Sequence, residues 1–306
     1  MVTLLSSILL CWLMLWLFFG MLTTLIYPAL RSTLHNIDPA QASTCILAWL
    51  AIAPCAALLA TYIVYSPDIA QWLVTGHCHA DGCRIHGPQS TLAIVPAALL
   101  AAWILYRIVD CLLRQWLPAR RLCAQLSQFG EDGQDFITLA SAQPMAFTLG
   151  WLAPKVFISA GMQHACSAED IDCILLHEAA HRQRRDNLRL LMARILSAPL
   201  PGLWPVRALD DLKLNCEKAC DLHAAAKLSR ETVAGALVRV AKVQQHAAPA
   251  ASLAFVGNLT EQRIIALLDE PQAPLANQIV FAMGSAVLLV VLAMINPLHR
   301  VVELLP

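Results

Sequence analysis

Charged side chains are scarce in this sequence. Asp, Glu, Lys and Arg together make up 14% of the 306 residues, whereas hydrophobic residues make up 58%. Soluble globular domains carry about 25% charged residues, so this composition argues against a soluble protein and for one that lies in a membrane. The 21 basic and 21 acidic residues cancel, which leaves no general electrostatic basis for binding nucleic acid. We therefore expect a protein whose partner is the lipid bilayer, with no direct nucleic-acid partner.

Long segments almost without charge account for much of this scarcity. A helix of about 20 apolar residues is needed to cross the hydrocarbon core of a bilayer. The sequence predicts three such spans at about residues 4–27, 43–66 and 91–113, and a fourth at 278–297. The first span is not interpreted as a cleaved signal peptide, because it has no basic leader and no small-residue cleavage site follows it.

Basic residues are scarce in two of the segments outside the predicted spans. The loop between the second and third predicted spans contains only Arg84, and the tail contains only Arg300. The positive-inside rule then places the amino terminus outside and residues 114–276 in the cytosol. We expect a multi-pass protein of a bacterial-type inner (cytoplasmic) membrane. Its parts would be a three-span region (residues 1–113), a cytosolic domain (residues 114–276), and a fourth span with a short external tail (residues 277–306).

The 11 cysteines do not form a disulfide framework. Most lie in predicted spans or in the predicted cytosolic domain, where free thiols are expected. Cys78 and Cys83 share the external loop, and two interpretations of them remain open. One is a small disulfide or a plain loop, and the other is a metal cluster with His77, His79 and His86. The first is favoured, because the spacing does not match a closed zinc site.

The predicted cytosolic domain combines short strands with amphipathic helices. Ser167, followed by acidic residues, indicates a helix start, and this helix is expected to run from Ala168 to about Arg184. Pro118 is expected to kink or divide the helix before the strands. A further amphipathic helix is predicted at residues 187–197. Three strands are predicted, the last two paired in a hairpin: residues 136–139, 145–149 and 155–159.

The strongest chemical signal is the motif HEAAH at residues 177–181. On a helix, His177 and His181 are four residues apart and share a face, so both imidazoles can bind one zinc ion and leave coordination positions open. Glu178 is placed to act as general base toward a metal-activated water. Chance supplies this pattern in roughly one in a hundred chains of this composition. The alternative is a solvated helix that carries two histidines by coincidence.

A catalytic zinc site of this kind needs a third protein ligand. Glu217 is the best candidate, and Asp221 lies four residues later on the same helical face. Asp221 is expected to accept a hydrogen bond from a ligand histidine and so fix its tautomer. The alternative is an ordinary polar helix face.

Residues near these motifs are expected to have lesser roles. Arg182, Arg184 and Arg185 are expected to form a solvated face. Cys216 and Cys220 are interpreted as small apolar fillers. The predicted hairpin can bind an extended substrate along its edge or be purely structural, and the sequence does not separate these two interpretations.

Three stretches together resemble a known family, the BlaR/MecR-type membrane metallopeptidases. They are HEAAH continued to Asp186, the upstream segment FTLGWLAPKVFIS (residues 147–159), and Glu-Lys-Ala-Cys-Asp (residues 217–221). The order of three spans, a cytosolic zinc domain and one further span is similar as well. The resemblance implies a mainly α membrane protein with a zincin-like α+β peptidase domain inserted between the third and fourth spans. It also implies one zinc ion per chain and these roles: ligands His177, His181 and Glu217, base Glu178, and Asp221 in support.

The sequence departs from the family at its end. The antibiotic-sensing members continue into an external penicillin-binding sensor domain, whereas this sequence stops at Pro306. We therefore expect a short form without that domain and without direct β-lactam sensing. The resemblance still implies regulated cleavage of a cytosolic or membrane-proximal protein, such as a transcriptional repressor, with a separate sensor protein as a candidate partner. It also suggests self-cleavage around residues 245–258.

The sequence thus predicts a membrane-embedded zinc metalloendopeptidase, with two alternatives. One is a quality-control protease of the HtpX type, which also carries HExxH and a later ExxxD but places two spans ahead of the motif rather than three. The other is a non-proteolytic signalling or assembly subunit with structural zinc. Glu178 argues against the latter, because a structural site needs no base and usually closes all four positions with protein ligands.

Overall fold

The computed structural model describes residues 2–66, 69, 94–133, 135–200, 205–247, 253–269, 284–285, 288–294 and 297. Three of its helices are long and apolar enough to cross a membrane. They coincide with the first three predicted spans: α1 (Val2–Leu34), α2 (Pro39–Tyr65) and α4 (Ile94–Phe129). The loop with Cys78 and Cys83, most of the fourth predicted span and residues 248–252 lie outside the described residues.

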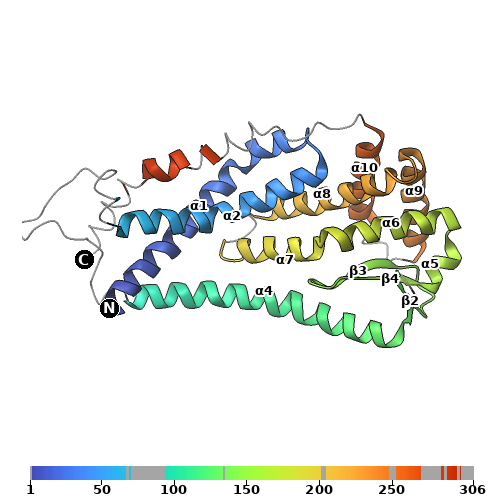
Figure 1. The fold of residues 1–306 in the computed structure, drawn as a ribbon, viewed down its shortest axis with the longest axis horizontal. Coiled ribbons are helices and arrows are strands. Elements are labelled where there is room, and N and C mark those ends of the chain that lie inside the picture. Colours follow the sequence, from blue (N-terminus) through green and yellow to red (C-terminus); the bar gives the residue numbers. More distant parts are fainter. Residues whose placement is uncertain are drawn as a thin grey trace, which may run out of the picture.

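Helix α4 is longer than a bilayer requires. Its 36 residues span about 54 Å at 1.5 Å per residue, against about 30 Å of hydrocarbon. The excess carries its far end to the sheet, where Cys123 and Leu126 pack against Ile137 and Phe157 (Figure 1). Pro118 lies inside this helix and does not divide it; the other predicted outcome, a kink, stays a prediction. A proline removes one backbone hydrogen bond, and the packing on the sheet holds the helix beyond it.

The sheet has four strands in the order β1-β2-β4-β3. Strands β3 and β4 form the predicted antiparallel hairpin, while β2 pairs with β4 in parallel. Gly150 begins the hairpin turn with φ of 110°, a conformation that residues with a Cβ rarely adopt. Because β3 comes last in the strand order, it forms one edge of the sheet. The bounds are β1 Glu131–Asp132, β2 Ile137–Leu139, β3 Ala146–Leu149 and β4 Lys155–Ser159, followed by the short helix α5 (Ala160–Ala165).

Helix α6 (Ala168–Arg184) has the predicted bounds. Ser167 and Asp170 form a reciprocal capping box at its start, which satisfies backbone donors that the first turn leaves unpaired. Arg185 ends the helix in the left-handed conformation, with φ of 53°, and helix α7 (Asp186–Ser197) begins at the next residue. One residue therefore separates the HEAAH helix from the helix that follows.

Three more helices follow: α8 (Val206–Ala225), α9 (Arg230–Ala247) and α10 (Leu253–Leu268). Helix α6 lies between the sheet and α8, and α9 and α10 lie at the same end of the molecule (Figure 1). A hydrophobic core joins α7 and α8 to the ends of α1 and α2 that meet at residues 35–38. Its buried members include Tyr27, Ile46, Trp49, Ala193 and Leu212.

Candidate metal centre and active site

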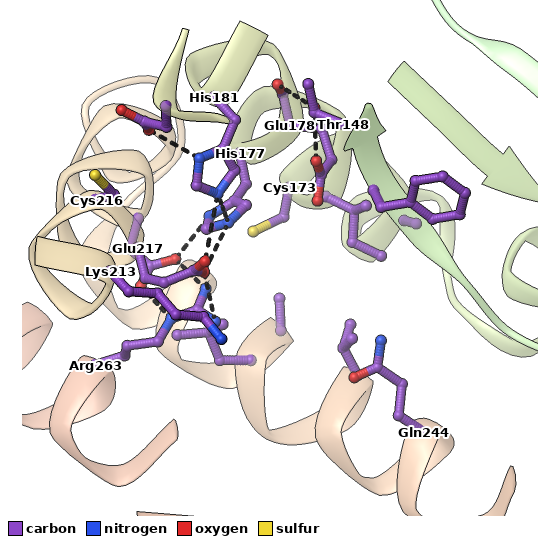
Figure 2. A pocket seen from close by; sticks show the side chains of 18 of the residues that line it. Thr148, Cys173, His177, Glu178, His181, Lys213, Cys216, Glu217, Gln244 and Arg263 are labelled. Atoms are coloured by element: carbon purple, nitrogen blue, oxygen red, sulfur yellow. Dashed lines mark hydrogen bonds and ion pairs between the residues drawn. The ribbon is translucent and has the colours of Figure 1, made fainter. Parts of the chain in front are cut away.

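Helices α6 and α8 bring the three predicted metal ligands together. The Nε2 atoms of His177 and His181 lie 3.1 Å apart. Glu217 reaches both rings from α8, with Oε2 3.4 Å from Nε2 of His177 and Oε1 3.7 Å from Nε2 of His181 (Figure 2). One ligand atom from each residue lies within 4.8 Å of the others. Two ring nitrogens and a carboxylate thus converge on one point, a donor set that suits zinc.

Each imidazole is held by a carboxylate at its other nitrogen. Nδ1 of His177 lies 2.8 Å from Oδ1 of Asp221, and Nδ1 of His181 lies 2.9 Å from Oδ2 of Asp186. Both carboxylates are buried, with side chains 1% and 2% exposed. A proton held at Nδ1 leaves the lone pair of Nε2 directed toward Glu217, which is the tautomer a metal ligand needs.

Arg263 joins the two acidic residues of α8. It donates from Nε and Nη2 to the two carboxylate oxygens of Asp221, at 2.7 and 2.6 Å. Its Nη1 lies 3.2 Å from Oε2 of Glu217. No sequence pattern indicates this residue, because it lies on α10, 42 positions after Asp221. Oδ1 of Asp221 and Oε2 of Glu217 thus each contact both Arg263 and His177.

The charges of this cluster support one another. Burial would raise the pKa of Glu217, but its close contacts with the rings of His177 and His181 and the charge of Arg263 hold it well below its usual value. The pKa of Asp221 is likewise lowered, because Arg263 and His177 outweigh the effect of burial. Burial would lower the pKa values of both histidines, yet their carboxylate partners raise them. Both carboxylates of α8 are therefore ionised near neutral pH.

The candidate base, Glu178, is held by the edge strand. Thr148 on β3 donates to Oε2 of Glu178 at 2.8 Å and lies 3.0 Å from its backbone oxygen (Figure 2). Asn187 on α7 donates to the backbone oxygens of Thr148 and Gly150, at 2.9 and 3.3 Å. The predicted hairpin is thus attached to the HEAAH helix by side chains that the sequence did not single out.

A cavity of about 390 Å³ opens beside these residues. One wall carries the two histidines, Glu178 and Glu217. Met162 from α5 and Leu237, Val240 and Gln244 from α9 line the cavity as well. The predicted ligands and base therefore share one space large enough for part of a polypeptide chain.

Two predictions about neighbouring residues are wrong. Arg184 does not lie on a solvated face: its side chain is 19% exposed, and Nε lies 3.3 Å from Asp186. Cys220 is more than an apolar filler, because its Sγ lies 3.3 Å from Nδ1 of His181 and donates to Oδ2 of Asp186 at 3.5 Å. Burial raises the pKa of Cys220 to about 11, so this thiol is protonated and acts as a hydrogen-bond donor.

The region around the site has a recognisable family signature. Residues 119–214 match the model of peptidase family M48. The match supports a metallopeptidase, a class that typically uses zinc. It covers the end of α4, the sheet, α6 and α7, including HEAAH, and ends before Glu217. No curated protein and no solved structure gave a significant match. The finer BlaR/MecR-type assignment stays a prediction.

Proposed function

We propose that this protein is a membrane-embedded zinc metalloendopeptidase that hydrolyses peptide bonds of a protein substrate. The observation that carries the proposal is the convergence of His177, His181 and Glu217 on one point beside Glu178 in a shared cavity. Two nitrogens and one carboxylate oxygen hold a catalytic zinc ion and leave a coordination position open. When bound, the ion would lower the pKa of water and polarise the scissile carbonyl group.

The surrounding side chains prepare these groups for the reaction. Asp221 and Asp186 keep the protons of His177 and His181 at Nδ1, so that each Nε2 can act as a ligand. Arg263 keeps Asp221 and Glu217 ionised. These residues hold the three ligands in place before any substrate arrives.

Glu178 moves the proton in the proposed reaction. Thr148 occupies Oε2 of its carboxylate, which leaves Oε1 to accept a proton from the attacking water. The same carboxyl group then gives that proton to the departing amine as the peptide bond breaks. Burial of Glu178, at 9% exposed, limits competition from bulk water for this proton.

The edge of the sheet provides a place for the substrate backbone. Among the described residues, β3 pairs with β4 on one side only, and it carries Thr148, which contacts the base. An extended polypeptide can pair with such an edge through main-chain hydrogen bonds, largely independently of its sequence. A substrate bound along β3 would bring its backbone next to the HEAAH helix.

The proposed setting follows from the charge distribution and the family resemblance. We place the amino terminus outside the inner membrane, the zinc site in the cytosol, and the substrate among cytosolic or membrane-proximal proteins such as a transcriptional repressor. Activation would come from a separate sensor protein. The HtpX-type alternative is not favoured, because three candidate spans precede the motif. Structural zinc is not favoured either, because three protein ligands beside a glutamate leave the fourth position open.

The test uses the full chain in lipid nanodiscs, with zinc measured by mass spectrometry. New peptide termini are counted after incubation with a cytosolic protein extract. The wild type is expected to hold about one zinc per chain. Glu178→Gln should keep the zinc and lose cleavage by about 100-fold or more, because it removes the general base. His223→Ala, on α8 and outside the cavity lining, is the control and should retain both properties. A wild type without zinc, or undiminished cleavage by Glu178→Gln, would contradict the proposal.

A further inference from the structure

A buried serine of the second membrane helix binds two arginines of the peptidase region. Ser43 on α2 is fully buried. Its Oγ accepts hydrogen bonds from Nη2 of Arg184 at 2.9 Å and from Nη2 of Arg189 at 3.0 Å. The same hydroxyl donates to the backbone oxygen of Ala40 at 2.8 Å. One donor and two acceptor positions are all that a serine hydroxyl offers, so its hydrogen-bonding capacity is used completely.

The two arginines surround one carboxylate. Nε of Arg184 lies 3.3 Å from both oxygens of Asp186, and Nε of Arg189 lies 3.8 Å from Oδ1. The Asp186 side chain is 2% exposed, and the arginine side chains are 19% and 21% exposed. A buried carboxylate without partners is costly, so the guanidinium groups, together with the Cys220 thiol that donates to Oδ2, help to set the direction in which Asp186 points.

Asp186 in turn holds His181. Its Oδ2 lies 2.9 Å from Nδ1 of that ring, while Nε2 of the ring faces Glu217. Partners of this kind set the orientation and basicity of a metal-binding histidine, and their loss weakens metal binding by about 10- to 100-fold. An unbroken series of polar contacts therefore leads from a membrane helix to a proposed ligand.

We propose that Ser43 is a positioning residue for His181, acting through Arg184, Arg189 and Asp186, so that the placement of α2 sets the zinc affinity of the site. This inference rests on the proposed zinc peptidase function. It concerns only one of the two histidines. His177 is held by Asp221, which is fixed by Arg263 on α10 rather than by a membrane helix.

A purely structural role for Ser43 is the competing explanation. Ser43 would then clamp α2 onto α6 and α7, and its loss would lower the stability of the fold without acting specifically on the metal site. The two explanations differ in whether the effect of Ser43 on zinc binding passes through Asp186. A double-mutant cycle measures this difference, because residues that act through one another show non-additive effects.

The experiment measures zinc affinity of the full chain in nanodiscs by competition with a chromophoric chelator, alongside thermal unfolding of the metal-free protein. Ser43→Ala should weaken zinc binding about fivefold and Asp186→Asn about 10- to 100-fold. Adding Ser43→Ala to Asp186→Asn should cause little further loss. Ser32→Ala is the matched control, since that exposed serine on α1 donates to a backbone oxygen at 2.7 Å in the same way.

Each result decides between the explanations. An unchanged zinc affinity in Ser43→Ala overturns the inference and leaves the proposed function intact. An equal loss in the wild-type and Asp186→Asn backgrounds shows that Ser43 acts on the fold, and also overturns it. If Ser43→Ala does not fold, Arg184→Gln takes its place, and undiminished zinc binding there has the same meaning. A wild type that binds no zinc overturns both the inference and the proposed function.

Discussion

Glu178 is oriented by one threonine hydroxyl from another element. Thr148→Val keeps the shape of that side chain and removes its hydrogen bond to Oε2, at 2.8 Å. A hydrogen bond to a charged group contributes about 1.5–3 kcal/mol, so kcat should fall about 10- to 100-fold while zinc content stays the same. Steady-state cleavage of a peptide taken from the best-cleaved site in the extract measures the effect.

Thr138→Val on β2 is the matched control for this change. Thr138 lies in the same sheet, two strands away from Thr148 and outside the cavity lining, and its hydroxyl accepts a hydrogen bond from Gln163. Its variant should retain kcat. An unaltered kcat in Thr148→Val would show that the orientation of Glu178 does not depend on this contact, and a loss of zinc would show that the hairpin supports the ligands instead.

Residues of the site differ in how far sequence spacing could locate them. His177, Glu178 and His181 lie within one helical turn, so helical periodicity is enough to place them on neighbouring faces. Asp186 lies beyond the end of that helix, and the left-handed Arg185 brings it back to His181. No local sequence pattern predicts that Asp186 contacts His181. Arg263 is further still, because only the packing of α10 against α8 brings it to Asp221.

At the scale of single elements, the start of α6 depends on an acidic cap. Asp170 accepts hydrogen bonds from Ser167 and from Arg239 on α9, the latter at 2.7–3.1 Å. Burial would raise the pKa of Asp170, but these partners lower it below its usual value. A carboxylate with a lowered pKa stabilises the fold above its unfolded pKa of about 4, and this contribution is lost as the pH falls through the folded pKa.

Asp170→Asn should therefore lower the free energy of unfolding at pH 7 by about 1–3 kcal/mol, because it weakens the cap and leaves Arg239 without its charged partner. The loss of stability between pH 4 and lower pH should also become shallower than in the wild type. Chemical unfolding across this pH range, followed by circular dichroism, measures both effects. Glu169→Gln, in the same turn but exposed, is the control; an equal loss there would point to the helix dipole rather than the cap.

The sequence predicts helix bounds and strand pairings where caps or turns lie close to them in the chain, and it does not predict pairings between segments that no turn joins. The cap at Ser167 and the helical segment after it predicted the bounds of α6, and two short strand-like runs joined by residues 150–154 predicted the β3–β4 hairpin. The parallel pairing of β2 with β4 has no such signal, because the two strands are not joined by a turn. Pro118 does not end α4, since packing of this helix on the sheet outweighs one lost hydrogen bond.

At the scale of the whole molecule, the helices that carry the candidate site and the candidate membrane helices share a hydrophobic core. Residues of α7 and α8 are buried against α1 and α2. An ion pair lies next to this core, where Arg31 on α1 contacts Asp211 on α8 at 2.7 Å and Tyr27 donates to the same carboxylate at 2.9 Å. The helix that carries Glu217 is thus fixed to the first membrane helix.

A fragment of residues 114–276 should therefore not behave as a soluble domain. Without α1 and α2, the apolar faces of α7 and α8 would be exposed, and patches of this kind cause association. Expression of the fragment should give aggregates on gel filtration in buffer without detergent. The same fragment co-expressed with residues 1–66 is the comparison, and its recovery in detergent as a complex is expected. A monodisperse fragment that binds zinc alone would contradict the shared core.

The junction at Arg185 limits how this chain can vary in length. Asp186 lies five positions after His181, and their side chains are 2.9 Å apart. One inserted residue would displace the following chain by up to about 3.8 Å, beyond hydrogen-bonding distance, and would also turn Arg189 away from Ser43. Insertions and deletions between the second histidine and this aspartate are therefore incompatible with the network.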